Sequence, residues 1–368
     1  MVSWCWRSRG GFGPCQKHDR ARRDSPGGRA DTGYIAGRSR GGSTSLRAVT
    51  RLGFSAAVAV WLLALGCGGG SSSDPVRGQT PPPVSRSGSR PPLCTPLRTR
   101  VTGRVTTPAA IELSGLALSR AQARVLWTHN DSGDRARILA VAESGRLRAD
   151  LTVTGAEHVD WEDIAIGSAG QAGDALYIGD IGDNLAARSA VVVYRIPEPR
   201  LAGGAPSATA PALPLTLRYP DGPRDAEALL VDPSSGALVI VTKDFGGNAR
   251  VYVADHAAAN ATTTLRRAGQ VSLGTGAAVT AGDVSANGST IALRTYGRAF
   301  VWSRRRREPL ASALRRKPCA ARADLGAEGQ AEALALSRDG RAFHTVPEGE
   351  RPALRRYTPV THIHRPQR

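Results

Sequence analysis

The chain has few of the residues that mark several protein classes. Of its 368 residues, 5% are aromatic, five are cysteine and one is methionine. The only long apolar stretch, residues 53–66, falls short of the roughly 20 residues that a membrane-spanning helix needs. Gly and Pro are frequent, with 42 and 24 residues, but they follow no regular three-residue period. A polytopic membrane protein, a coiled coil and collagen are therefore excluded.

Acidic residues are scarce relative to basic ones, with 31 Asp and Glu against 49 Lys and Arg, and the net charge is +18. The excess is uneven along the chain. Residues 1–66 hold 11 Lys and Arg against 3 Asp and Glu, so nearly all the acidic residues lie behind them. This distribution indicates a soluble globular body that follows a basic leader.

Several catalytic and nucleic-acid-binding signatures are missing from the body. Residues 95–360 lack the Gly-x-Ser-x-Gly motif of serine hydrolases, and the seven histidines form no ligand pair spaced for one helix. The basic clusters Arg304–Arg307 and Arg315–Lys317 contain no interleaved aromatic residues, so we expect no nucleic-acid partner. We expect these clusters to form a solvated loop between repeats, close enough to an anchor to touch anionic lipid or polysaccharide.

Residues 51–67 have the features of a secretory signal. The stretch Gly53–Gly66 follows Arg47 and Arg51, and its length matches the apolar core of a signal peptide. The sequence Leu63-Ala64-Leu65-Gly66-Cys67 resembles the lipobox of bacterial lipoproteins, which implies that Cys67 is lipidated and becomes the mature N-terminus. The alternative is a buried core helix in which Cys67 is incidental. We expect an extracytoplasmic protein, lipid-anchored to a bacterial outer membrane or cell surface.

The regions on either side of this signal are expected to be irregular. Residues 1–50 have no apolar period, and we interpret them as a disordered leader upstream of the true start, near Leu46 or Val49. Residues 68–94 are rich in Gly, Ser and Pro and form a linker. The globular domain covers residues 95–360, and residues 361–368 form a polar tail.

Export changes the interpretation of the cysteines. Cys5 and Cys15 lie in the leader and Cys67 is the lipid site, so only Cys94 and Cys319 remain in the mature body. An even number in an oxidising compartment favours a disulfide between them, and two buried free thiols are the alternative.

The body contains five copies of one pattern, in which a small or acidic residue precedes an apolar run, a Gly-containing turn and a second apolar run. Aligning the apolar runs places five residues in one column, in steps of 48, 65, 53 and 52 residues: Ser114, Glu162, Glu227, Thr280 and Glu332. Each copy has the form of a β-hairpin, and a further β-rich segment follows most of them.

Units of about 50 residues with about four strands each predict an all-β fold, a β-propeller. We predict six blades and allow five to seven, since the end segments 100–106 and 354–357 could add strands to the five visible copies. A β-sandwich is the main competitor, but it would not explain a repeated Glu column.

In a propeller, the first strand of each blade lines the central channel, so the column would gather there. The predicted metal site therefore contains Glu162, Glu227 and Glu332, with the neighbouring acids Asp160, Asp163, Asp225 and Asp283. Facing carboxylates repel one another, so a proton or a cation must bind, and hard oxygen ligands suit Ca²⁺. Alternatively, these acids bond to backbone amides between blades.

Two polar segments end the second strands of the first two repeats, His129–Asp134 and Gly179–Asn184. They are either Asx turns with Gly133 and Gly182 at positive φ, or oxygen-rich loops at the channel mouth. The second interpretation adds Asp131, Asp180 and Asp183 to the metal ligands. Lys243, Arg188 and Arg294 could bring positive charge to the same rim and clamp an anionic group. Lys243, Arg294 and His129 are the candidate catalytic residues.

The body resembles a family of secreted bacterial β-propellers grouped as phytase-like, or "esterase-like activity of phytase". The resemblance covers residues 95–360 and rests on these segments: HNDSGD (129–134), VDWEDIAI (159–166), LYIGDIGDN (176–184), YRIPEP (194–199), and DAEALLVDP with VTKD (225–233 and 241–244). It implies Ca²⁺ in the channel, held by acids such as Glu227 and Asp163, and phosphate bound by Lys243. The gluconolactonase propellers are also similar.

Two functions therefore remain open. One is a Ca²⁺-dependent hydrolase of phosphate or carboxylic esters that takes an anionic small molecule at the channel. The other is a non-enzymatic platform, a lipid-anchored monomer that binds a protein or glycan of the cell envelope.

Overall fold

The computed structural model describes residues 4–7, 11–14, 91–201 and 207–360. The chain divides into two units, residues 1–81 and 82–368. In the first unit, β1 (Trp4–Arg7) and β2 (Gly11–Pro14) pair as an antiparallel hairpin with Trp6 opposite Phe12. The predicted anchor at Cys67 and the tail lie outside the described residues.

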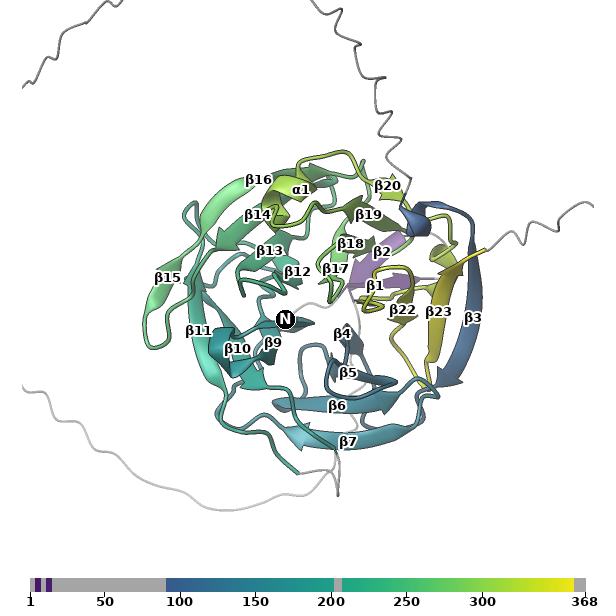
Figure 1. The fold of residues 1–368 in the computed structure, drawn as a ribbon, viewed down its shortest axis with the longest axis horizontal. Helices are drawn as coiled ribbons and strands as arrows, with labels where there is room; N and C mark the ends of the chain where they lie inside the picture. Colours follow the sequence, from purple (N-terminus) through teal and green to yellow (C-terminus); the bar gives the residue numbers. More distant parts are fainter. Residues whose placement is uncertain (1–3, 8–10, 15–90, 202–206, 361–368) are drawn as a thin grey trace, which may run out of the picture. The chain divides into compact units, whose positions relative to one another are not determined.

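The second unit is a five-bladed β-propeller, in which five antiparallel sheets surround one axis (Figure 1). Blade 1 contains β4 (Leu113–Leu118), β5 (Val125–Asn130), β6 (Arg137–Ala142) and β7 (Leu147–Thr152). Blade 2 contains β8 (Trp161–Ser168), β9 (Asp174–Asp180), β10 (Val191–Pro197) and β11 (Leu213–Arg218), with β15 (Thr262–Thr264) added parallel to β11. Blade 3 contains β12 (Ala226–Val231), β13 (Leu238–Thr242), β14 (Asn248–Ala254) and β16 (Arg266–Ser272).

Blade 4 contains β17 (Val279–Val284), β18 (Thr290–Thr295), β19 (Ala299–Ser303) and β20 (Cys319–Ala320). Blade 5 contains β21 (Ala333–Leu336), β22 (Phe343–Val346), β23 (Ala353–Pro359) and β3 (Leu97–Arg104). The helical elements are α1 (Leu310–Leu314), η1 (Pro92–Cys94), η2 (Gly170–Ala172) and η3 (Gly326–Glu328). No helix in the described part of the chain has both the length and the apolar character to cross a membrane.

The all-β propeller was predicted from the repeats, and the blade number falls at the lower end of the predicted range. The two end segments do not form a sixth blade, because they pair with each other. Antiparallel pairing joins β23 to β3, with Pro359 opposite Leu97, so the start of the body supplies the outer strand of the last blade. The five repeats are therefore the five blades.

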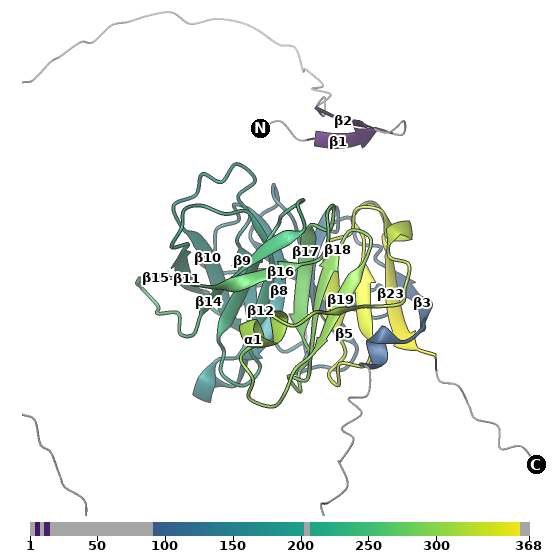
Figure 2. The same cartoon turned by 90° about the horizontal axis from the view of Figure 1, so that it is seen from above.

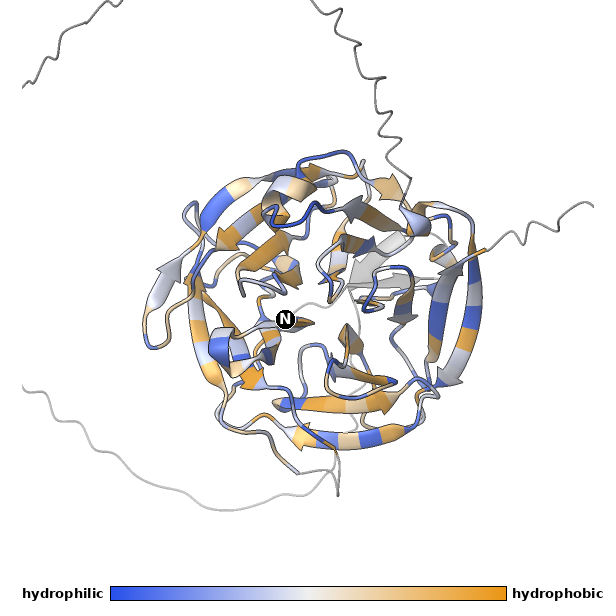
Figure 3. Ribbon diagram, viewed as in Figure 1, coloured by the Kyte–Doolittle hydropathy of each residue, from blue (hydrophilic) through white to orange (hydrophobic). Residues whose placement is uncertain are grey.

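The innermost strands form a closed ring. β4 packs against β8, β8 against β12, β12 against β17, β17 against β21, and β21 against β4. All six residues of β12 are buried, whereas the outer strand β7 alternates buried positions with partly or fully exposed ones. Figure 3 shows hydrophilic and hydrophobic residues alternating along β7. Strands that are buried along their whole length therefore lie inside the propeller, and alternating strands face solvent.

The hydrophobic core is divided among the five interfaces between blades. Each of five apolar clusters draws its residues from two adjacent blades. Between blades 1 and 2, for example, Trp127 and Trp161 are fully buried in the same cluster. Burying one such aromatic side chain stabilises the fold by about 3 kcal/mol.

A disulfide joins Cys94 to Cys319, the two cysteines that we expected to pair, over a sequence separation of 225 residues. The Cα atoms are 5.9 Å apart. The bond connects η1, where the chain enters the body, to β20 of blade 4. It therefore supplements the β3–β23 pairing in holding the beginning of the body against its later blades.

Candidate functional site

The aligned column of the repeats occupies the start of the inner strands. All five of its residues are buried, with exposed fractions between 0% and 5%: Ser114, Glu162, Glu227, Thr280 and Glu332. Because the inner strands form a closed ring, these residues meet at one end of the channel although they are far apart in sequence. The predicted convergence of Glu162, Glu227 and Glu332 is therefore present in the structure.

β-Bulges fix the direction of three of these side chains. The register shifts between Trp161 and Asp163, between Ala226 and Ala228, and between Val279 and Ala281. In each case the column residue is the extra residue of the bulge: Glu162, Glu227 and Thr280. A bulge places two residues opposite one and turns a side chain away from the regular alternation.

Five carboxylates at this end approach one another closely enough to share a cation. Oxygen atoms of Asp131, Asp160 and Glu162 all lie within 4.8 Å of one another, and so do oxygen atoms of Glu162, Asp225 and Glu227. Glu162 belongs to both groups and links them. The two groups span blades 1, 2 and 3.

Two further carboxylates belong to the same cluster. The charge of Glu332 raises the pKa of Glu227 and of Asp131, and Glu348 lies beside Glu332. The Tyr296 hydroxyl donates a hydrogen bond to Glu332 Oε1 over 3.0 Å. We call these seven residues the acidic mouth: Asp131, Asp160, Glu162, Asp225, Glu227, Glu332 and Glu348.

Five carboxyl groups of the acidic mouth have raised pKa values, because burial and mutual repulsion both oppose their ionisation: Asp131, Asp160, Glu162, Glu227 and Glu348. Burial, followed by the charge of Glu332, raises the pKa of Asp131 to about 7 and that of Glu348 to about 8. Burial, followed by Asp225, raises the pKa of Asp160 to about 6. The pKa of Glu162 is raised well above its usual value by burial and by Glu227.

One ammonium group partly balances these charges. Lys243 forms an ion pair with Glu227 Oε1, and its Nζ lies 5.9 Å from the ring centroid of Tyr296. Burial opposes the charge of Lys243, but Glu227, Tyr296 and Glu332 together outweigh burial and raise the pKa of the ammonium. The charge of Arg188 also acts on Asp160, but the carboxylates of the mouth outnumber these two cations, so the mouth favours an added cation.

The mouth also contains polar atoms without partners. Asp131 Oδ1 and Glu227 Oε2 are buried and accept no hydrogen bond. A Cβ atom on Gly182 would overlap Glu162 Oε1 and come within 2.5 Å of Asp160 Oδ2. The backbone conformation of Gly182 is not of positive φ, contrary to our expectation, so the glycine is needed because two carboxylates lie against it.

Asp163, predicted to be a metal ligand, instead binds three backbone amides. Its oxygens accept hydrogen bonds from the N–H groups of Ile164, Leu229 and Gly282, over 2.9 to 3.1 Å, and so join the inner strands of blades 2, 3 and 4. Asp283 does the same toward blade 5, accepting from Leu336 N–H over 2.7 Å. For these two residues the backbone-capping alternative is correct, because successive residues of a strand point to opposite sides.

The two predicted ligands of the second blade also have structural roles. Asp180 accepts hydrogen bonds from the N–H groups of Val159 and Asp160 and pairs with Arg188 over 2.8 Å. Asp183 accepts from the N–H groups of Ala187 and Arg188. Both carboxylates bind loop residues through these contacts, and neither belongs to the two cation-binding groups.

Arg294, a predicted catalytic residue, is fully buried, and its charge is paired with an acid outside the mouth. Its Nη2 pairs with Glu328 Oε2 over 2.7 Å, and its Nη1 donates to Ala333 O. Glu328 also accepts hydrogen bonds from Thr345 and Tyr357, so the arginine belongs to an ionic network between blades 4 and 5. The expectation that Arg294 clamps a substrate is wrong.

His129, the other predicted catalytic residue, is packed between blades 1 and 2. It is fully buried, and its ring meets Trp161 edge-on at 5.6 Å. Burial lowers its pKa to about 4, so the imidazole is neutral at physiological pH. Its ring is closed off by Gly115, whose missing Cβ would lie 2.7 Å from Nε2. A base role for His129 is therefore incorrect.

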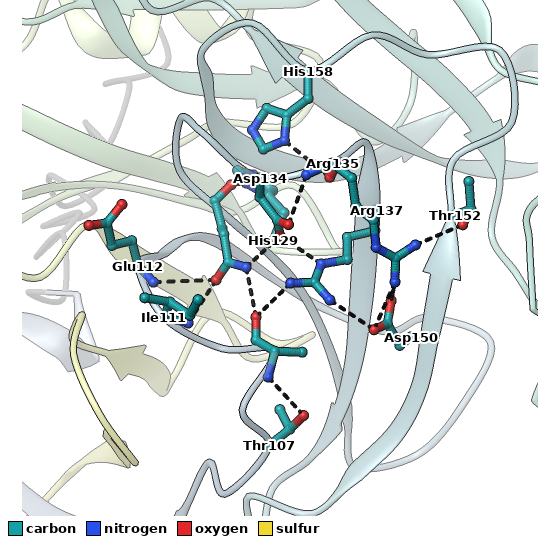
Figure 4. Close-up of polar contacts among 12 residues, drawn as sticks. Thr107, Ile111, Glu112, His129, Asp134, Arg135, Arg137, Asp150, Thr152 and His158 are labelled. Carbon is teal, nitrogen blue, oxygen red and sulfur yellow. Dashed lines mark hydrogen bonds and ion pairs between the residues drawn. The ribbon is translucent and has the colours of Figure 1, made fainter. Parts of the chain in front are cut away.

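The rest of the segment 129–134 is fixed by hydrogen bonds and ion pairs, several of which Figure 4 shows. Asn130 Oδ1 accepts from the N–H groups of Ile111 and Glu112, and its Nδ2 donates to Asp134 Oδ2 over 2.6 Å. Asp134 in turn pairs with Arg137. The segment is thus a structural turn with Gly133 at φ 89°, and of its acids Asp131 alone joins the mouth.

Asp160 and Asp225, which the sequence placed beside the metal site together with Asp163 and Asp283, complete the cation-binding groups, whereas the predicted ligands Asp163, Asp180 and Asp183 do not. The signal that could have selected them is a repeated Asp-x-Glu, in Asp160–Glu162 and in Asp225–Glu227. Residues two apart lie on the same side of a strand.

Comparisons with known proteins identify no family. No protein-family model matches the sequence, and a search of curated proteins finds no match. Among solved structures, the PQQ-bound aldose sugar dehydrogenase of Streptomyces coelicolor has 12% identity and a TM-score of 0.43, over 72% of this chain and 98% of that one. The gluconolactonase XC5397 of Xanthomonas campestris has 14% identity and a TM-score of 0.42, over 71% of this chain and 89% of that one. At these values neither likeness bears on the chemistry of the acidic mouth.

Proposed function

We propose that the acidic mouth binds Ca²⁺ and hydrolyses phosphate or carboxylic esters at the end of the channel. The observation that carries the proposal is the pair of carboxylate groups that share Glu162. Carboxylate oxygens are the ligands that Ca²⁺ prefers, and no sulfur or imidazole joins either group. The unpartnered oxygens of Asp131 and Glu227 fit a cation, because a bound cation would satisfy both.

The residues of the mouth have different roles in the proposed reaction. Asp131, Asp160, Glu162, Asp225 and Glu227 would hold the cation, which when bound polarises an ester oxygen and activates water. Lys243, fixed by Glu227, offers positive charge to an anionic ester. Glu348, whose pKa is about 8, is suited to exchange a proton near neutral pH. Arg294 and His129 take no part.

A test of this function compares turnover with and without the cation. The full-length chain is assayed on nitrophenyl phosphate and nitrophenyl acetate, in Ca²⁺ and in EDTA. We expect hydrolysis that requires Ca²⁺, is lost in Glu162→Gln and is retained in the control Asp255→Asn, which changes an exposed carboxylate paired with Arg266 in blade 3. Calcium binding without hydrolysis of either ester would refute the enzymatic function.

A non-enzymatic platform is the second candidate, favoured by an apolar rim. Six large hydrophobic residues are exposed in the described part of the chain, and four lie on loops beside the mouth, with exposed fractions of 54% to 83%: Ile111, Val159, Leu185 and Phe245. Val159 precedes Asp160, and Phe245 lies two residues after Lys243. Exposed apolar groups next to a polar centre are typical of binding surfaces for a protein or glycan.

The location of the protein is part of the same proposal. Lipidation at Cys67 would anchor an extracytoplasmic monomer to a bacterial membrane, as in a phytase-like lipoprotein. The disulfide between Cys94 and Cys319 supports an oxidising compartment. Detection of a diacyl group on Cys67 by mass spectrometry of the membrane fraction would test the anchor, and an intact peptide that spans Cys67 would contradict it.

A further inference from the structure

The end of the propeller opposite the acidic mouth carries a concentrated positive charge. Each inner strand begins at the mouth and ends in a turn at the other end, such as 232–237 after β12 and 285–289 after β17. The loop between β19 and β20 lies against these turns, since Arg304 pairs with Asp232 and donates to Gly288 O. This loop, residues 304–317, contains six arginines and one lysine but a single acid, Glu308. We call it the basic loop.

Part of the basic loop is fixed to the body and part is free. Arg304 is held by Asp232, and Arg316 forms an ion pair with Glu308, so the one acid of the loop is already occupied. Arg305, Arg306 and Arg307 are exposed, and within the described residues none of them forms an ion pair. Three adjacent exposed charges without partners repel one another, so an anionic partner relieves that repulsion.

The arginines of the basic loop surround a hollow in the protein surface. Arg304–Arg307 and the turns at Ser234 and Asn287 line a surface hollow of about 260 Å³. Arg307 has φ 61°, in the left-handed region that residues other than glycine rarely adopt. The chain turns at Arg307 and enters α1 three residues later, so the helix helps to fix the conformation of the loop that carries the arginines.

The entry of the chain into the body lies at the end of the basic loop. The disulfide attaches Cys94, in η1, to Cys319, two residues after Lys317. Figure 2 shows α1 and the blue segment before β3 toward the same end of the blades. Any tether that precedes Pro91 therefore starts beside the basic loop.

We propose that the basic loop docks on an anionic lipid surface and turns the acidic mouth away from it. Phosphate headgroups match guanidinium groups in charge and geometry, and a membrane offers many of them on one plane. Lipid is favoured over nucleic acid because the loop has no aromatic side chain for base stacking. The docking requires neither Ca²⁺ at the mouth nor hydrolysis.

The experiment measures vesicle binding by the full-length chain with Cys67→Ser, so that no attached lipid contributes. Sedimentation with vesicles of phosphatidylcholine alone gives the baseline for the apolar stretch 53–66. We expect stronger binding when phosphatidylglycerol is added. Binding should fall as salt is raised to about 0.5 M, where the screening length is about 4 Å.

The decisive variant replaces Arg305, Arg306 and Arg307 with glutamate. Each arginine near an anionic surface contributes about a 5-fold gain in binding, so we expect a loss of at least about 100-fold. The matched control reverses the same number of charges on the outer strands of three other blades: Arg100→Glu, Arg148→Glu and Arg218→Glu. It should lose no more than about 5-fold, and the triple glutamine variant of the loop should fall between the two.

Three results would overturn the proposal. They are an equal loss in the control, no preference for anionic vesicles, or tighter binding to a single-stranded DNA oligonucleotide than to vesicles at the same salt concentration.

Discussion

Replacing Glu162 with glutamine should have opposite effects on the protein with and without Ca²⁺. Glu162 is 2% exposed and belongs to both carboxylate groups, whose oxygens lie within 4.8 Å of one another. Two unit charges at that distance repel by about 3 kcal/mol at an effective dielectric constant of 20. Because several neighbours are partly protonated at neutral pH, we expect the substitution to raise the free energy of unfolding in EDTA by about 2 kcal/mol.

With Ca²⁺ present, the order should reverse. A ligand at 100 times its dissociation constant stabilises the native state by about 2.7 kcal/mol, and the variant should gain little of this because it lacks the shared ligand. Glu162→Gln should thus be more stable than the native sequence in EDTA and less stable in Ca²⁺. Urea unfolding at pH 7.5, with and without the cation, measures both differences.

The adjacent residue provides the control. Asp163→Asn removes a carboxylate that accepts three backbone hydrogen bonds, so it should lower stability by about 3 kcal/mol in both conditions alike. If Glu162→Gln also loses stability in both conditions, or if both proteins gain equally from Ca²⁺, the reasoning about the mouth is wrong.

Three further predictions concern the pH dependence, the ring closure and the packing of the mouth. The pKa values of Asp131 and Glu348, about 7 and about 8, lie above the values of these groups in the unfolded chain, so the native state binds protons more tightly. The free energy of unfolding in EDTA should therefore fall as the pH rises from about 4 to about 8. A free energy of unfolding that rises across this range in urea titrations would contradict the prediction. Replacing Cys94 and Cys319 with serine should lower the free energy of unfolding by about 5 kcal/mol at most, measured by urea unfolding with and without reductant. An unchanged unfolding midpoint would show that the β3–β23 pairing alone closes the ring. Gly182→Ala should weaken Ca²⁺ binding about 10-fold in calorimetry, because a Cβ displaces two carboxylates, and an unchanged affinity would place the cation elsewhere.

Most of the fold could be predicted from the repeat pattern of the sequence. The column from Ser114 to Glu332 appeared in the sequence because each blade starts with the same strand–turn–strand unit, and the structure places it at the channel. The predicted number of six blades exceeded the five present because the pairing between β3 and β23 joins residues 249 to 262 positions apart. A local sequence pattern does not indicate which edge strands will pair with each other.

The side-chain directions were harder to predict. Glu162 and Asp163 are adjacent acids with similar sequence context, yet one faces the mouth and the other binds amides of blades 3 and 4. A β-bulge makes that choice, and bulges depend on the tertiary fit of two strands. Arg294 was assigned to the rim because its partner, Glu328, lies 34 residues later, in a segment outside the repeat.

The shared last blade also has a consequence for biosynthesis. β3 is among the first parts of the body to be translated, but its partner β23 ends at Pro359, so the ring stays open until almost the whole chain has been made. A ribosome-bound or partly translocated chain can form hairpins but cannot complete the fifth blade. Until β23 has been made, β3 therefore remains an unpaired edge strand and the ring remains open.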